Sequence, residues 1–142
     1  MIVGRCVEEP LDTFLLDACK SKDVQIIYKN DFVSMDEYES VVAQSDWIMA
    51  LHVNFYWSSG TIGHAAAHGK GLIATSQGLI GRLVKEHQLG LVADPFSSTE
   101  IAAQLEKAIT STHSASDESK QFNDSNSAQE FIRSLLSAPP SN

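Results

Sequence analysis

The chain has 142 residues, 43% of them hydrophobic and 20% charged, and a formal net charge of −8. This length suits one compact domain that buries roughly two-thirds of its unfolded surface. The acidic balance and the scattered basic residues argue against a nucleic-acid partner. No apolar run approaches the roughly 18 residues that cross a bilayer, and no signal-peptide pattern is present, so we expect no transmembrane segment and a cytoplasmic location.

Short apolar runs alternate with helical patterns from residue 1 to residue 110. The runs are nearly continuous in apolar character, which strands buried on both faces require. They are Ile2-Val3, Val24 to Tyr28, Trp47 to Leu51, Leu72 to Ala74 and Leu91 to Ala93. The pattern predicts a three-layer, Rossmann-like α/β domain over 1–110, with a five-stranded parallel sheet and helices on both faces. We expect the N-terminal strand at its centre and the Val24 strand at one edge.

Local signals place the ends of the intervening helices. Pro10 is tolerated at a helix start, and apolar residues follow it at helical spacing. Two capping-box patterns, each a serine three residues before a glutamate, predict two further starts. They are Ser34 with Glu37 and Ser97 with Glu100. Two glycines, Gly69 and Gly90, stand where helices are expected to stop, because glycine adopts the left-handed cap conformation at little cost.

The C-terminal part is more polar. Residues 111–127 are rich in Ser, Asp and Asn and are expected to form a polar linker. Residues 128–137 regain a helical stripe in Phe131, Ile132 and Leu135, and 138–142 are expected to form a disordered tail. Cys6 and Cys19 are too far apart in sequence for a paired-thiol motif, so we expect reduced, packed thiols.

The segment after the third apolar run carries the strongest signal for ligand binding. The strand is expected to end near Leu51, and Ser58-Ser59-Gly60-Thr61 then opens a helix that runs to His68. Unpaired backbone N–H groups, the helix dipole and three hydroxyls would face the carboxyl edge of the sheet there. This combination suits a phosphate group, although serine and glycine at a helix start also serve as a plain N-cap.

From Val24 to Leu105 the chain resembles the donor-binding domain of retaining, two-domain (GT-B) glycosyltransferases. The resemblance rests on the order of patterns rather than on a single motif. The matching segments are Ser45-Asp46-Trp47-Ile48-Met49, His64 to Lys70, Gly71 to Thr75, Gly78 to Val84 and Leu89 to Pro95. It implies a nucleoside-diphosphate sugar as donor substrate, with no other cofactor.

The resemblance also implies roles for individual residues. Ser58, Ser59, Gly60 and Thr61 would hold the donor diphosphate. The loop with Asp31, Phe32 and Ser34 lies where the family holds the nucleobase, and Phe32 would stack on the base or else pack into its own core. Arg5 is a candidate for the family's phosphate-contacting arginine. Tyr56 and His64 stand where the family has two glutamates, which puts recognition of the sugar and ribose at those positions in question.

No catalytic residue is assigned from the sequence. The family's acceptor-binding domain has no counterpart here, so we expect a partial glycosyltransferase that needs that domain as a partner. Ser58 and Ser59 lack the glycine flanks of a nucleophile elbow. His64 and His68 have a metal-ligand spacing, but Ala65 replaces the glutamate of metalloproteases and no third ligand is near, so no metal is expected.

One alternative remains open at this point, and a second is disfavoured by the residues. A non-catalytic or truncated Rossmann-like interaction domain would explain the departures from the family's pattern. A receiver-like signalling module has the same layered architecture but needs a phosphorylatable Asp after the third strand, where His52 and Asn54 stand.

Overall fold

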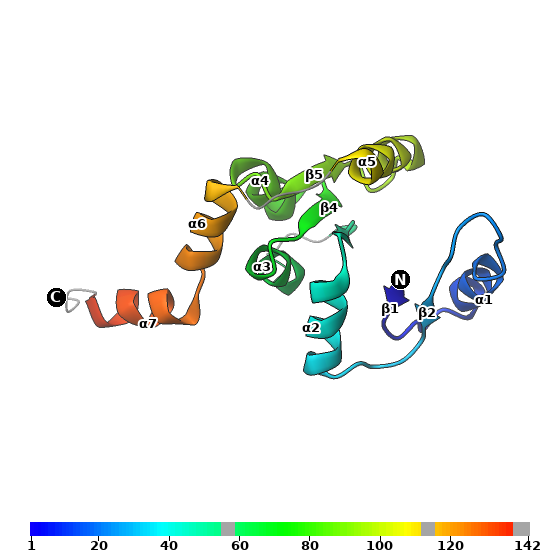
Figure 1. Ribbon diagram of the computed structural model, residues 1–142, viewed down its shortest axis with the longest axis horizontal. Coiled ribbons are helices and arrows are strands. Elements are labelled where there is room, and N and C mark those ends of the chain that lie inside the picture. The colour runs from blue at the N-terminus through cyan, green and yellow to red at the C-terminus, as the bar shows by residue number, and fades with distance from the viewer. Residues whose placement is uncertain (55–58, 112–115, 138–142) are drawn as a thin grey trace. The chain divides into compact units, whose positions relative to one another are not determined.

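The computed structural model describes residues 1–54, 59–111 and 116–137. In these ranges the chain forms seven helices and five strands, and every strand pairing is parallel (Figure 1). The α/β class expected from the alternating apolar runs is therefore confirmed. The described residues include no helix with the length and apolar character needed to cross a membrane.

The chain divides into two compact units, Met1–Ser40 and Val41–Asn142. The first contains β1 (Ile2–Val3), α1 (Glu9–Ala18) and β2 (Tyr28–Lys29), and α2 (Met35–Gln44) runs across the boundary. β1 and β2 form a two-stranded parallel sheet in which Ile2 lies opposite Tyr28. None of residues 1–40, all of which are described, is buried. The expected strand from Val24 is shorter than predicted, since only its last residue and Lys29 are in β2.

The second unit is built on three parallel strands in the order β3, β4, β5. They are β3 (Trp47–Ala50), β4 (Gly71–Thr75) and β5 (Gly90–Ala93). All five residues of the central strand β4 are buried, as its continuous apolar sequence predicts. Because the strands are parallel, their carboxyl ends at Ala50, Thr75 and Ala93 share one edge of the sheet.

Five helices follow within the second unit. They are α3 (Gly60–Ala67), α4 (Gly78–Glu86), α5 (Ser98–Thr110), α6 (Asp117–Ser125) and α7 (Ala128–Ser137). The first three contact the sheet, whereas α6 contacts α3. The core gathers small and branched side chains from the sheet and from α3 and α4, together with Phe122 of α6.

The segment 111–127, expected as a polar linker, contains a helix instead. α6 begins after Ser116, whose side-chain oxygen accepts a hydrogen bond from the Ser119 amide at 3.1 Å. Its one large apolar side chain, Phe122, is only 7% exposed. The helix therefore has one large apolar anchor, beside the buried Ser119, and hydrophobic periodicity does not reveal it. The expected helix 128–137 matches α7, while the side chains of Phe131 and Leu135 and the tail 138–142 lie outside the described residues.

The structure confirms three of the predicted capping residues and contradicts the fourth. The Ser34 and Ser97 oxygens accept hydrogen bonds from the Glu37 and Glu100 amides, both at 3.2 Å, which confirms two helix starts. Gly69 has a φ of 63° just after α3, as a helix-ending glycine should. The prediction for Gly90 is wrong, because Gln88 takes the left-handed conformation after α4, with φ 51°, and Gly90 begins β5.

A single five-stranded sheet would need one further pairing, of β1 with β3. The described strands form a two-stranded and a three-stranded sheet. The five-stranded, Rossmann-like arrangement and the domain limits predicted with it therefore stay predictions.

Candidate functional site

The junction between β3 and α3 places Ser59 at the N-cap of the helix. Its side-chain oxygen accepts a hydrogen bond from the Thr61 amide at 3.3 Å, and its carbonyl accepts one from the Ile62 amide at 3.0 Å. Ser59 thus satisfies two of the amides that a helix start leaves unpaired. Gly60 is exposed, and no atom lies within 4 Å of where a Cβ would be. A ligand can therefore approach the backbone closely at this position.

His52 lies just beyond β3 and contacts the same serine. Its Nε2 atom is 3.2 Å from Ser59 Oγ. Both groups are partly buried. A hydrogen bond forms between the two groups when the Ser59 hydroxyl donates to Nε2 of a neutral His52 that carries its proton on Nδ1. Sequence reasoning missed His52 as a site residue, because its contact with Ser59 spans the strand-to-helix loop.

The junction between β4 and α4 lies on the same edge of the sheet. Thr75, only 1% exposed, accepts a hydrogen bond from the Gln77 amide through its side-chain oxygen at 3.2 Å. Gln77 is the N-cap residue of α4, but its side chain makes no capping hydrogen bond and donates instead to Asp94 at 3.4 Å. Gly78 then begins α4 with a φ of 62°. Helix α4 therefore has no side-chain cap from its N-cap residue.

Acidic residues are distributed unevenly over the helix N-termini. Among the described helices, α1, α2, α5, α6 and α7 each have at least one Asp or Glu in the first turn. Helices α3 and α4 have none. An acidic side chain there compensates the positive end of the helix dipole. The two helices that start at the β3 and β4 ends therefore have no acidic residue of their own first turn at the positive end, and the nearby Asp94 contacts the N-cap side chain of α4.

A pocket of about 420 Å³ lies beside α3. On one side it is lined by Ser59, Gly60 and Gly63, and no atom lies within 4 Å of a Cβ position at either glycine. On the other side are His87 and Phe122, whose ring centroids are 4.9 Å apart at an angle of 48°. The pocket thus combines a bare helix surface, an aromatic wall and the N-cap serine.

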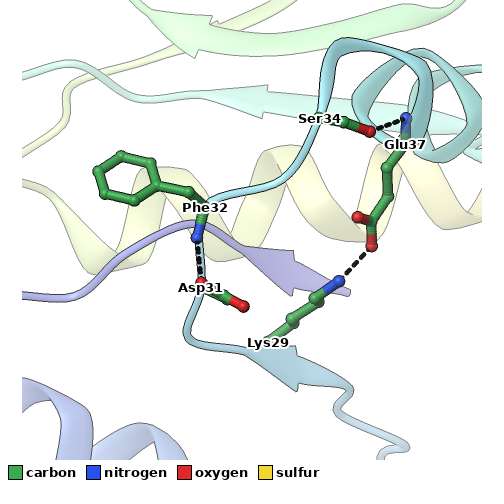
Figure 2. A network of polar contacts seen from close by, with 5 residues as sticks. All are labelled: Lys29, Asp31, Phe32, Ser34 and Glu37. Carbon is green, nitrogen blue, oxygen red and sulfur yellow. Dashed lines mark hydrogen bonds and ion pairs between the residues drawn. The ribbon is translucent and has the colours of Figure 1, made fainter.

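Four predicted site residues lie together in the first unit, after β1 and β2. The Arg5 guanidinium lies 5.5 Å from the centroid of the Phe32 ring. Figure 2 shows the loop that follows β2, where the Asp31 carboxylate accepts a hydrogen bond from the Phe32 amide at 2.8 Å and Ser34 caps α2. In the same view Lys29 forms an ion pair with Glu37. Phe32 is 75% exposed, which contradicts the alternative that it packs into its own core.

A second polar cluster surrounds Tyr28. Its hydroxyl donates to Asp12 at 2.7 Å, and the Asn30 amide donates to the same carboxylate oxygen at 2.7 Å. Desolvation and this hydrogen bond raise the pKa of Tyr28 above its ordinary value. The Cys6 amide donates to Asn30 at 2.8 Å. The thiols of Cys6 and Cys19 are free, as expected, but partly exposed rather than packed.

Of the three remaining predicted site residues, the structure describes only His64. His64 is in α3 and half-buried. Tyr56 and Ser58 lie outside the described residues, so their roles stay predictions. The described part of the chain contains no group of three or more His, Cys, Asp or Glu that would hold a metal ion.

Searches against protein-family models, curated proteins and solved structures find no match to this chain. The class of protein therefore follows from the fold and the site alone. It is an α/β protein in which hydroxyl groups and two helix N-termini gather at the carboxyl edge of a parallel sheet.

Proposed function

We propose that this chain binds a nucleoside-diphosphate sugar, as the donor-binding domain of a retaining, two-domain glycosyltransferase. The diphosphate binds at the start of α3, on Ser59, Gly60 and Thr61. Ligands of open parallel sheets bind beyond the carboxyl ends of the strands, which is where this helix begins. In this proposal an acceptor-binding domain completes the enzyme as a partner.

The observation that carries the proposal is the absence of acidic side chains from the first turns of α3 and α4. Both helices direct their positive ends to one sheet edge, and both begin with a glycine, Gly60 or Gly78. Anions bind at such helix starts through backbone N–H groups and the dipole. The remaining described helices have an acidic first turn, which would repel a phosphate.

Binding requires a small rearrangement at Ser59. Its hydroxyl now contacts His52 and accepts the Thr61 hydrogen bond. A phosphate oxygen replaces Ser59 as acceptor for the Thr61 amide, and the hydroxyl turns to donate to the phosphate. Hydrogen bonds to an ionised acceptor are roughly twice as strong as neutral ones, so the exchange favours the bound state.

The proposal includes the five-stranded sheet, in which β1 pairs with β3. Parallel strands are found almost only in sheets that are covered on both faces. In the first unit Ile2 and Ile27 are 41% and 50% exposed, so its two-stranded sheet lacks this cover by itself. In this arrangement Phe32 stacks on the nucleobase and Arg5 contacts phosphate. Asp31 and Ser34 belong to the same loop as Phe32 and lie beside the base. His64 and Tyr56 contribute hydrogen bonds to the sugar or ribose.

Calorimetric titration with UDP, GDP and ADP tests the binding. We expect one of the three to bind the native chain and Ser59→Asp to weaken it, because a carboxylate within about 4 Å of phosphate costs about 1–4 kcal/mol, or roughly 5- to 1000-fold in affinity. Ser97→Asp is the matched control. It introduces the same charge at the N-cap of α5, and Asp caps helices as well as Ser does. Equal affinity of the Ser59→Asp variant and the native chain would refute the assignment.

A second candidate function is a non-catalytic interaction domain. The observation that favours it is the apolar surface of α1, where Leu11, Phe14 and Leu16 are 46%, 67% and 53% exposed. Exposed apolar patches of this kind mark interaction surfaces. A thermal-shift panel separates the two functions, because only a ligand that binds the native state raises the melting temperature. No shift with any of the three nucleotides would favour the interaction domain.

A further inference from the structure

The hydrogen-bonded pair His52 and Ser59 adjoins the pocket beside α3. We propose that Ser59 is a nucleophile and His52 its general base, and that the pair hydrolyses small esters whose acyl group occupies this pocket. The inference does not rest on donor binding. It is carried by the contact between the two side chains and by a pocket that contains the same serine.

The first observation is the geometry of the pair. A serine is activated when a base lies within hydrogen-bond reach of its oxygen, and His52 Nε2 is 3.2 Å from Ser59 Oγ. The Thr61 amide donates to a lone pair of the same oxygen at 3.3 Å, which orients the hydroxyl. His52 lies two residues beyond the end of β3, and Ser59 is the N-cap residue of α3, so each is close to a regular element.

The second observation is the pocket that Ser59 lines. Its volume of about 420 Å³ lies within the usual range for small-ligand sites, roughly 300–1,000 Å³. Gly60 and Gly63 lie one helical turn apart and leave the α3 backbone uncovered on this side. Leu83 and Phe122 supply apolar walls. These features suit a short aliphatic or aromatic acyl group bound next to the nucleophile.

The reaction follows from these positions. Ser59 Oγ attacks the ester carbonyl carbon as its proton passes to His52 Nε2, and an Oγ–C bond forms. Ser59 is not in a glycine-flanked nucleophile elbow, but the backbone N–H of Gly60, the residue after it, is at a helix start and donates to the oxyanion. The bond between the carbonyl carbon and the alcohol oxygen then breaks, and His52 returns the proton to the departing alkoxide. Water, deprotonated by His52, attacks the acyl-serine, releases the carboxylic acid and restores Ser59.

Diisopropyl fluorophosphate tests the nucleophile, because it phosphorylates activated serines and releases fluoride. We expect the native chain to gain one diisopropylphosphoryl group, mapped by mass spectrometry to Ser59. His52→Phe should slow the labelling at least about 100-fold, the usual contribution of a general base. The matched control is Ser97→Ala, which removes the N-cap serine of α5, a residue without a described histidine contact, and should label at the native rate.

The pocket is tested with p-nitrophenyl butyrate. We expect the native chain to hydrolyse it and Gly63→Leu to lower the rate at least about tenfold, because the leucine side chain would fill the acyl pocket. A thermal melt shows that each variant is folded.

Three results would overturn the inference: no labelling of the native chain, labelling at another residue, or equal labelling rates for His52→Phe and the native chain. Unchanged butyrate hydrolysis in Gly63→Leu would overturn the pocket assignment. Nucleotide titration is a separate measurement, so the failure of either proposal is recognised without the other.

Discussion

Gly90 shows how a single backbone position holds β5 against β4. It has a φ of 151°, and a Cβ atom there would lie 2.1 Å from the Leu72 carbonyl oxygen. A side chain would therefore be strained by its own backbone and would also collide with the neighbouring strand. We expect Gly90→Ala to lower the free energy of unfolding by about 3 kcal/mol, measured by urea denaturation.

The Gly63→Ala variant is the control for Gly90→Ala. It lies in the middle of α3 and has no atom within 4 Å of its Cβ position. Alanine is the better helix former by about 1 kcal/mol, so Gly63→Ala should stabilise the chain slightly. Similar losses of stability in both variants would show that β5 does not approach β4 as described.

The residues of the candidate site could be predicted from sequence only in part. Ser59 was found because a hydroxyl followed by glycine at a helix start is a local pattern, and its capping hydrogen bond is present. His52 was missed because its contact with Ser59 spans a loop, and no local pattern sets that distance. For the same reason Phe32 could not be classed as exposed or buried before the structure showed it 75% exposed.

At the scale of elements, α6 has one large apolar side chain in the core. Phe122 is 7% exposed, joins the core cluster and pairs with His87. Replacing a buried phenylalanine by alanine removes its transfer free energy and leaves a cavity. We expect Phe122→Ala to lower the free energy of unfolding by about 3–5 kcal/mol in urea denaturation. Circular dichroism should show reduced helix content, since α6 has no other large apolar residue.

Ile109→Ala in α5 serves as the comparison for this element. Ile109 is 83% exposed, and surface substitutions of this kind change stability by about 0.5 kcal/mol or less. If both variants lose stability equally, Phe122 does not anchor α6.

Helices differed in how well the sequence predicted them. α2, α5 and α7 follow local signals, either a serine cap or a regular apolar stripe, and occur where expected. The sequence of α6 is dominated by polar residues, so its stability comes from contacts with α3 and with His87, which a local pattern does not contain.

At the scale of the whole molecule, the proposed five-stranded sheet can be tested by hydrogen exchange at one backbone amide, that of Val3. The amides of Ile2 in β1 and of Gly4 just after it donate to the Ile27 and Lys29 carbonyls, so the Val3 amide between them points to the opposite side of the strand. If β1 also pairs with β3, the Val3 amide donates a hydrogen bond to the backbone of β3. We expect hydrogen exchange at Val3 to be as slow as at Ile2 and Gly4. Rapid exchange at Val3 beside slow exchange at its neighbours would contradict the single sheet.

The sequence by itself determined the α/β class, the positions of the strands in the second unit and most helix starts. These features depend on residues close together in the chain, namely the continuous apolar run of β4 and the capping serines Ser34 and Ser97. Only the tertiary structure decided that α6 forms on Phe122, that Gly90 admits the close approach of β5 to Leu72, and that His52 contacts Ser59. Each of these depends on a distance between atoms that belong to different elements, and packing sets such distances rather than local conformational preference.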